Sequence, residues 1–216
     1  NRYTVMQATE GLARYIEKRQ ETDASGVVIG FDSRNNSEVF AHAAAEVLAK
    51  HGIQVYLFRD IIPTPVVYYA LLQKKAVAAI ILTASHNPPE YNGYKVYWKH
   101  GGQIIPPDDE MIIDEVRSVD DIAEIPQMAF EDALQQGRIE WIEDDIDLEY
   151  LENLLPLSFG KPSQNEQLGV IYTPLHGTGG RLVPRLLKER GFINVHCVAS
   201  QMVPDGNFST AVSYTH

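Results

Sequence analysis

The stretch Gly26–Gly52 reads GVVIGFDSRNNSEVFAHAAAEVLAKHG, and it decides how the chain folds. Residues 26–31 are apolar and rich in β-branched side chains, which is typical of a buried strand. A polar loop over 32–36 follows. Apolar residues then recur at helical spacing, with Ser37 as the expected N-cap of the helix and Gly52 at its C-cap position. The stretch therefore predicts one unit of strand, loop and helix.

The same pattern extends on both sides of this unit. A helix is predicted over 5–19, because apolar residues recur there every three or four positions. After the unit, the sequence predicts a strand over 53–58, a helix from Pro63 to Leu72 and a strand over 76–82. Strands that alternate with helices favour an α/β domain with a mixed, largely parallel sheet flanked by helices.

Beyond residue 82 the pattern is less regular. Residues 93–98 and 101–105 are typical of a hairpin whose turn is supplied by a glycine pair. A helix is expected from Pro106 to about Val116, and another over 148–157. The acidic segment 120–147 between them predicts surface connections. We expect these elements to complete a first domain over residues 1–160.

A second domain is expected over residues 161–216. A polar stretch with glycine and proline covers residues 158–167, and a new apolar strand begins at Leu168. The pattern predicts a strand over 168–172, a helix over 181–190 and a strand over 195–198. One βαβ unit is too little to close an independent core. The sequence is therefore expected to stop inside an incomplete second α/β domain.

The charge balance limits the classes of partner. The 216 residues include 18 Lys plus Arg and 29 Asp plus Glu, for a formal net charge of −11. Such a chain repels phosphate polymers and anionic membrane surfaces, so we expect no nucleic-acid and no membrane partner. The single cysteine, Cys197, has no partner for an internal disulfide, and no apolar run approaches the roughly twenty residues that cross a bilayer. A cytoplasmic protein is the expectation.

One loop concentrates residues that can do chemistry. Residues 83–95 read TASHNPPEYNGYK and follow a predicted strand, so they are expected at the carboxyl edge of the sheet, where ligands bind. Ser85 is a candidate nucleophile or phosphoryl carrier, and His86 and Lys95 are candidate proton or charge partners. The segment Asn87–Pro89 stiffens the loop. On spacing alone, the pattern also fits an ordinary turn with a solvated serine.

This loop resembles the phosphoserine loop of the α-D-phosphohexomutases, the superfamily of phosphoglucomutase and phosphomannomutase, whose signature is T-A/G-S-H-N-P followed by N-G-Y/F-K. Other similar segments follow in the family's order along nearly the whole chain: 5–15, Gly30–Arg34, Pro63–Pro65, Thr173–Gly177 and Asp205–Phe208. The resemblance implies a first phosphohexomutase domain followed by part of the second. The sequence at 97–98 and 102–105 is most similar to the branch that holds bacterial phosphoglucomutases and phosphopentomutases.

The resemblance also implies roles for individual residues. Ser85 is expected to carry a phosphoryl group, and Lys95 to supply positive charge and assist proton transfer at the serine oxygen. His86 is expected to orient the loop or the phosphate. The implied active-site network further contains Asp32, Arg34 and Asn87. For the first two of these, an ion pair at the surface end of a strand is the alternative.

The implied reaction moves phosphate between the 1 and 6 positions of a hexose, with glucose 1,6-bisphosphate as intermediate and activator. Phosphomannomutase, phosphopentomutase or sugar-bisphosphate synthase activity, or a non-catalytic remnant, are the alternatives. The family's Mg²⁺ is held by the seryl phosphate, here on Ser85, and by aspartates of a D-G-D-x-D-R loop that this sequence lacks. Residues 211–216 also depart from the family's S-P-N-P-E string. We therefore expect a longer parent chain, with this part inactive on its own.

The remaining polar patterns predict structure rather than chemistry. Loop His176–Gly180 has the glycines of a phosphate cradle, but a turn that packs the second domain is the favoured interpretation. The scattered histidines lack the spacing of zinc ligands. The acidic run 143–147 lacks the glycine and the spacing of a calcium loop.

Overall fold

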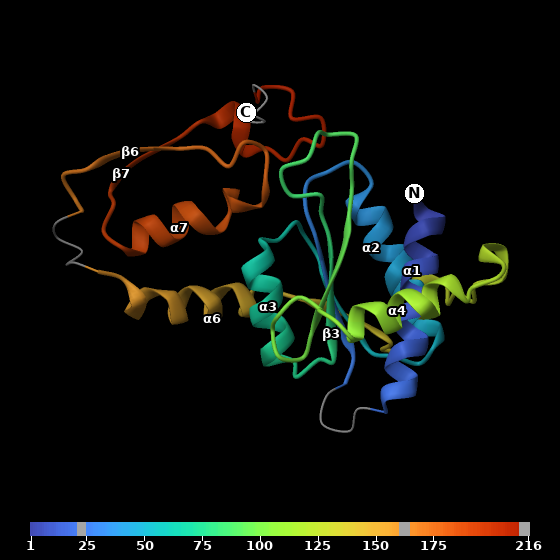
Figure 1. Cartoon of the computed structure of the whole chain (residues 1–216). Helices are drawn as coiled ribbons and strands as arrows, with labels where there is room; N and C mark the ends of the chain where they lie inside the picture. Colours follow the sequence, from blue (N-terminus) through green and yellow to red (C-terminus); the bar gives the residue numbers. More distant parts are fainter. Residues whose placement is uncertain (21–24, 160–164, 212–216) are drawn as a thin grey trace.

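The structure, a computed structural model, describes residues 1–20, 25–159 and 165–211. A five-stranded sheet in the order β4–β3–β1–β2–β5 lies between helices, and a separate two-stranded sheet pairs β6 with β7 (Figure 1). The strands are β1 (Val27–Phe31), β2 (Val55–Phe58), β3 (Ala78–Leu82), β4 (Tyr94–Trp98), β5 (Ile139–Ile142), β6 (Gly169–Tyr172) and β7 (Asn194–Cys197). The helices are α1 (Arg2–Arg19), α2 (Ser37–Lys50), α3 (Thr64–Gln73), α4 (Asp108–Arg117), α5 (Phe130–Gln135), α6 (Asp145–Leu154), α7 (Leu182–Glu189) and α8 (Ala199–Met202). The predicted α/β class is confirmed.

The direction of the strands places two loop ends side by side. Strands β1, β2, β3 and β5 run parallel, and only β4, at one edge, runs antiparallel to its neighbour β3. In the register of β1 and β3, Phe31 lies opposite Leu82. The loops that follow these two strands therefore leave the sheet at the same point.

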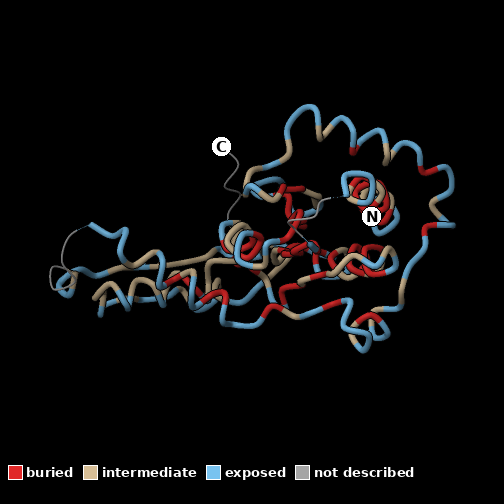
Figure 2. Tube along the Cα trace, turned by 90° about the horizontal axis from the view of Figure 1, so that it is seen from below, coloured by how far each residue is buried: buried red, intermediate tan, exposed pale blue. Residues whose placement is uncertain are grey.

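The core has two layers, one on each face of the sheet. Alternate residues of β1 enter different clusters, because side chains of a strand point to opposite faces. Val27 and Ile29 belong to the cluster that α1 and α2 cover, and Val28 belongs to the cluster that α3 and α6 cover. Figure 2 shows the buried residues gathered in this part of the molecule. Burial on both faces accounts for the continuous apolar runs of the central strands.

A charged cluster joins α1 to the end of α2. Nε2 of His51 lies 2.8 Å from Oε2 of Glu10, and its Nδ1 lies 2.8 Å from Oε1 of Glu17. Glu10 is buried and also accepts a 2.8 Å hydrogen bond from Nε of Arg14. Burial by itself lowers the pKa of the His51 imidazole, but the hydrogen bonds to the two glutamates outweigh it and raise that pKa above its ordinary value.

The predicted cap of α2 was wrong by one residue. Asn36 is the N-cap, with a left-handed φ of 66°, and its side chain makes no capping hydrogen bond. Ser37 is the first helical residue, and its hydroxyl donates to Oδ1 of Asp32 at 2.8 Å. A hydrogen bond to an ionised carboxylate is stronger than one between neutral groups. The Ser37 hydroxyl therefore bonds to Asp32 in the preceding loop instead of capping the helix.

Two predictions for the middle of the chain were also incomplete. Residues 101–105 fold back along the outer edge of β4, where the N–H of Trp98 donates to the carbonyl of Gly102 and that of Ile104 donates to the carbonyl of Val96. They do not form a full second hairpin strand, because only Tyr97 and Gln103 pair, as an isolated bridge. The acidic segment 120–147 is not only surface connection, since it contains α5 and β5. In β5, Ile139 and Ile142 are buried beside β2 while Glu140 is exposed, and four residues are too few for a period to be evident in the sequence.

The second unit is a parallel βαβ arrangement of β6, α7 and β7, as predicted. Among the described residues after 164, only His176 and Leu182 are buried. Arg181 joins this unit to α6 through ion pairs with Asp144 and Asp147. The expected domain boundary, between residues 160 and 161, lies outside the described residues. No described helix is both long and apolar enough to cross a membrane.

Candidate active site

The candidate site begins where β1 and β3 end. Asp32 follows β1, and the loop from Thr83 follows β3, at neighbouring positions on the carboxyl edge of the sheet. The loop returns to enter β4, and the backbone N–H of Thr83 donates to the carbonyl of Gly93 at 3.1 Å. A Cβ on Gly93 would lie 2.5 Å from the carbonyl oxygen of Thr83, so the closed base of the loop requires glycine.

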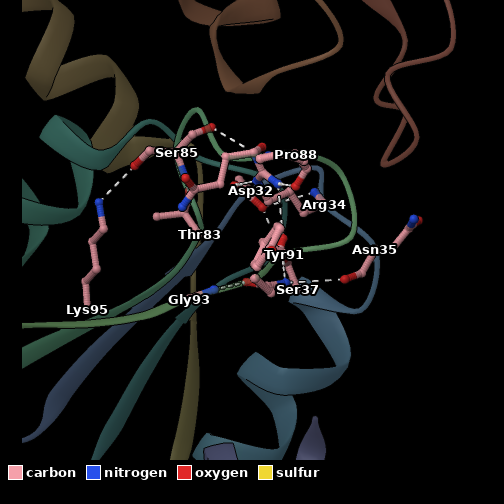
Figure 3. A network of polar contacts seen from close by, with 12 residues as sticks. Asp32, Arg34, Asn35, Ser37, Thr83, Ser85, Pro88, Tyr91, Gly93 and Lys95 are labelled. Carbon is pink, nitrogen blue, oxygen red and sulfur yellow. Dashed lines mark hydrogen bonds and ion pairs between the residues drawn. The ribbon is translucent and has the colours of Figure 1, made fainter. Parts of the chain in front are cut away.

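Ser85 is exposed at the tip of this loop, and its hydroxyl has a defined partner. Its φ of 56° lies in the left-handed region, and its backbone N–H donates to Oγ1 of Thr83 at 2.9 Å. Nζ of Lys95 donates to Oγ of Ser85 at 2.8 Å (Figure 3). Lys95 comes from β4, opposite Ile81 of β3, so the antiparallel edge strand is what brings the ammonium back to the serine.

The Arg34 side chain holds the loop by donating hydrogen bonds to the backbone carbonyls of the loop. The residue is 3 % exposed, and Figure 3 shows its guanidinium within the turn of the loop. Nη1 donates to the carbonyls of Pro88 and Tyr91, at 2.8 and 3.0 Å. Nη2 donates to the carbonyls of Ser85 and Asn87, at 2.9 and 2.5 Å. One buried cation therefore satisfies four carbonyls of an exposed loop, an arrangement that only the planar fork of arginine provides.

Asp32 shapes the first loop of the site. Its Oδ1 accepts from the backbone N–H of Arg34 at 3.0 Å and from the hydroxyl of Ser37 at 2.8 Å. Its Oδ2 lies 3.4 Å from Nε of Arg34, so the carboxylate offsets the buried charge. Asn92 connects the two loops, because its Nδ2 donates to the same serine hydroxyl at 2.8 Å. Arg34 is buried and Asp32 is half-buried, so the pair does not lie on the surface.

The predicted site residues fall into two groups. Ser85 and Lys95 are in direct contact, and Asp32 and Arg34 support the loop that carries the serine. His86 and the side chain of Asn87 are exposed, and within the described chain neither donates to or accepts from the serine, Lys95 or Arg34. Asn87 contributes through its backbone carbonyl instead.

A cavity of about 410 Å³ lies between this edge and the second unit. Asp32, Thr83 and Ser85 line it on one side. The lining on the other side comes from the second unit: Tyr172, Pro174, Leu175, Gly177, Thr178, Gly179 and Phe208. Thr83 and Phe208 were not predicted as parts of the site. The only sequence signal for them was their place inside segments that resemble the family.

The glycine-rich loop of the second unit, His176–Gly180, has a mainly structural role. His176 is buried, with Nδ1 2.8 Å from the carbonyl of Val203 and Nε2 2.7 Å from Oγ1 of Thr210. These bonds tie the loop to the last described segment, while Gly177 and Gly179 line the cavity. The favoured interpretation, a turn that packs the second domain, agrees with this arrangement.

The fit of Mg²⁺ to this chain depends on its donor groups. Divalent magnesium needs several oxygen ligands, usually with carboxylates among them. No group of three His, Cys, Asp or Glu side chains within 1–20, 25–159 and 165–211 is arranged to hold a metal ion. The described residues therefore do not form a magnesium site by themselves.

Comparisons with known proteins agree with this geometry. Residues 1–123 match the family model for the phosphoglucomutase/phosphomannomutase α/β/α domain I, and residues 148–214 match that for domain II. The chain is 37% identical to a probable phosphomannomutase of Haemophilus influenzae, over 97% of this chain and 42% of that protein. It is 36% identical to a phosphopentomutase of Homo sapiens, over 97% of this chain and 36% of that protein.

A phosphoglucomutase of Staphylococcus saprophyticus is 32% identical, again over 97% of this chain and 37% of the relative. The solved structure of a Thermus thermophilus protein superposes with a TM-score of 0.76 at 26% identity, and the match covers 98% of this chain and 44% of that one. The chain thus spans about two fifths of the length of these relatives. Since two domain models of one family match it in order, the chain belongs to the phosphoglucomutase/phosphomannomutase family.

Proposed function

We propose that Ser85 carries the phosphoryl group in a phosphoglucomutase-type phosphotransfer between sugar 1-phosphate and sugar 6-phosphate. The observation that carries the proposal is the 2.8 Å hydrogen bond from Nζ of Lys95 to Oγ of Ser85. It involves an exposed hydroxyl that lines a cavity large enough for a small polar ligand. A solvated serine in an ordinary turn needs no ammonium partner and no buried arginine beneath it.

The chemistry follows from the groups in place. When Ser85 gives up its phosphoryl group, the bond between phosphorus and Oγ breaks and a sugar hydroxyl oxygen forms the new bond to phosphorus. The sugar hydroxyl releases its proton to solvent, and Lys95 delivers a proton to Oγ. On the return transfer from a sugar bisphosphate, the bond between phosphorus and the sugar oxygen breaks and the new P–O bond forms at Oγ. The Oγ proton goes back to Nζ, and the sugar oxygen takes a proton from solvent. Because phosphoryl transfer depends mainly on in-line positioning and charge neutralisation, the rigid loop and the ammonium are what this chain contributes.

Within this proposal, glucose 1-phosphate and glucose 6-phosphate are the exchanged pair and glucose 1,6-bisphosphate is the intermediate and activator. Mannose or pentose phosphates, or net synthesis of the bisphosphate, are the alternatives, and relatives carry each of these names. Mg²⁺ would neutralise charge on the phosphoryl oxygens when bound, with the seryl phosphate as the ligand that this chain supplies. We propose a cytoplasmic setting, a sugar phosphate as the partner, and no turnover by these residues alone.

The test is to label the serine. The longest reading frame that contains this chain is incubated with Mg²⁺ and glucose 1,6-bisphosphate carrying labelled phosphate, and the label is mapped by peptide mass spectrometry. We expect label at Ser85, none in Ser85→Ala, and unchanged labelling in Ser158→Ala, a matched control at an exposed serine outside the loop and outside the residues that line the cavity. A folded protein without label at Ser85 would refute the phosphoserine role and favour a non-catalytic relative.

A further inference from the structure

The loop around Phe208, in the second unit, lies against Arg34, which holds the serine loop (residues 83–93). The ring of Phe208 covers the Arg34 guanidinium, with 5.4 Å between the ring centroid and Cζ. Next to it, Nδ2 of Asn35 donates to Oδ1 of Asn207 at 2.8 Å. These contacts join segments more than 170 residues apart, at the face of the guanidinium that the four loop carbonyls leave open. Both neighbouring elements, the end of β1 and the serine loop, belong to the candidate site.

The segment that presents the ring is fixed by its own hydrogen bonds. Oδ1 of Asp205 accepts from the backbone N–H of Asn207, and Oδ2 accepts from that of Ser209, both at 2.9 Å. Hydrogen bonds from Ser209 and Asn207 lower the pKa of the Asp205 carboxyl to about 2. His176 holds both ends of the segment, through the carbonyl of Val203 and the hydroxyl of Thr210. The ring is therefore presented on a preformed loop rather than on a loose one.

The backbone of this segment is strained where it meets the arginine. Phe208 has a φ of 52°, in the left-handed region that a bulky aromatic residue rarely adopts. Ser85, whose carbonyl accepts a hydrogen bond from Arg34, has a φ of 56°. Strained residues persist only where their surroundings hold them, and they gather at functional sites. Gly206 adds a close approach, because a Cβ there would lie 2.6 Å from the backbone N of Asn35.

We propose that Phe208 is a positioning residue for the phosphoserine loop, acting through Arg34. The ring keeps water from the open face of the guanidinium and attracts its charge, so the fork stays under the loop with its four hydrogen bonds intact. The second unit thereby orders a loop of the first. The consequence for phosphoryl transfer rests on the function proposed for Ser85, whereas the consequence for loop order does not.

The experiment separates these two consequences. Hydrogen exchange is measured by mass spectrometry on this chain for peptides that cover 83–93, in Phe208→Ala and in Phe159→Ala, a matched control at a phenylalanine that is 99% exposed. We expect exchange in the loop to rise about tenfold in Phe208→Ala, from the loss of a partly desolvated cation–π contact, and not at all in the control. Peptides of β1 and β3 report whether the first domain stays folded.

Rescue variants distinguish positioning from simple filling of space. Phe208→Tyr keeps the aromatic face and should restore both slow exchange in the loop and phosphorylation of Ser85 in the longest reading frame. Phe208→Leu keeps apolar bulk without that face and should restore neither. Gly206→Ala pushes the segment away from Asn35 and should reproduce the effect of Phe208→Ala.

Loop exchange that is unchanged in Phe208→Ala, or equally restored by leucine, would overturn the proposal. If the wild-type protein takes no label at Ser85 but the exchange results hold, the phosphoserine function fails and the positioning role stands.

Discussion

Replacing Arg34 by lysine tests how the serine loop is held. The substitution keeps a positive charge beside Asp32 but removes the planar fork. Nη1 serves one pair of loop carbonyls and Nη2 serves the other, so a single ammonium nitrogen reaches only one pair and two of the four hydrogen bonds are lost. A hydrogen bond to a charged group contributes about 1.5 to 3 kcal/mol.

The freed carbonyls belong to exposed residues, so water replaces part of what is lost. We therefore expect the loop alone to lose about 2 kcal/mol of local stability, a roughly thirtyfold rise in its opening. Hydrogen exchange of residues 83–93 measures this opening, and urea unfolding measures the stability of the whole chain. Arg117→Lys is the matched control, because the Arg117 side chain is 76% exposed.

The reasoning fails if exchange in the Arg34→Lys loop matches that of the wild type. It also fails if the strands of the central sheet gain exchange as much as the loop does, because the arginine would then support the whole domain. Phosphorylation of Ser85 should slow in parallel with loop opening, since in-line transfer depends on where its oxygen is held.

Three further changes have outcomes that the geometry determines. His51→Gln should lower the unfolding free energy by about 1 kcal/mol below about pH 6.5, because the two glutamate partners of His51 stabilise its charged form. The loss should become smaller as the pH rises through the raised pKa of the folded imidazole. Urea unfolding at about pH 6 and about pH 8.5 checks the sign, and a difference that grows with pH contradicts it. Gly93→Ala should cost about 1 to 3 kcal/mol in urea unfolding, because its Cβ meets the carbonyl of Thr83. Gly169→Ala, where the nearest atom is a side-chain nitrogen 3.4 Å away, should cost less, and equal losses would count against the steric argument. Lys95→Met should slow phosphoryl transfer by about a hundredfold or more while leaving the unfolding midpoint unchanged, as measured by the rate of label uptake; a rate close to that of the wild type would remove the lysine from the mechanism.

Local pattern was sufficient for most of the fold. The apolar run of β1 and the helical spacing of α2 each lie within a dozen or so residues, and such periods are readable because burial acts on every turn or every second residue. The serine loop was also evident, since its glycine, prolines and polar residues are contiguous. Strand β5 escaped detection because four residues at a sheet edge bury only two side chains.

What the sequence determined by itself was the α/β class and the presence of the serine loop, while the chemical roles of Ser85 and Lys95 were predicted from the resemblance to the family. Tertiary structure alone decided that Lys95 reaches that serine, because this depends on the antiparallel register of β4. It also decided that Arg34 is a buried clamp rather than a surface ion pair, and that Phe208 of the second unit covers it. These contacts join atoms from distant segments, and their energies depend on burial and direction, which exist only once the chain has folded.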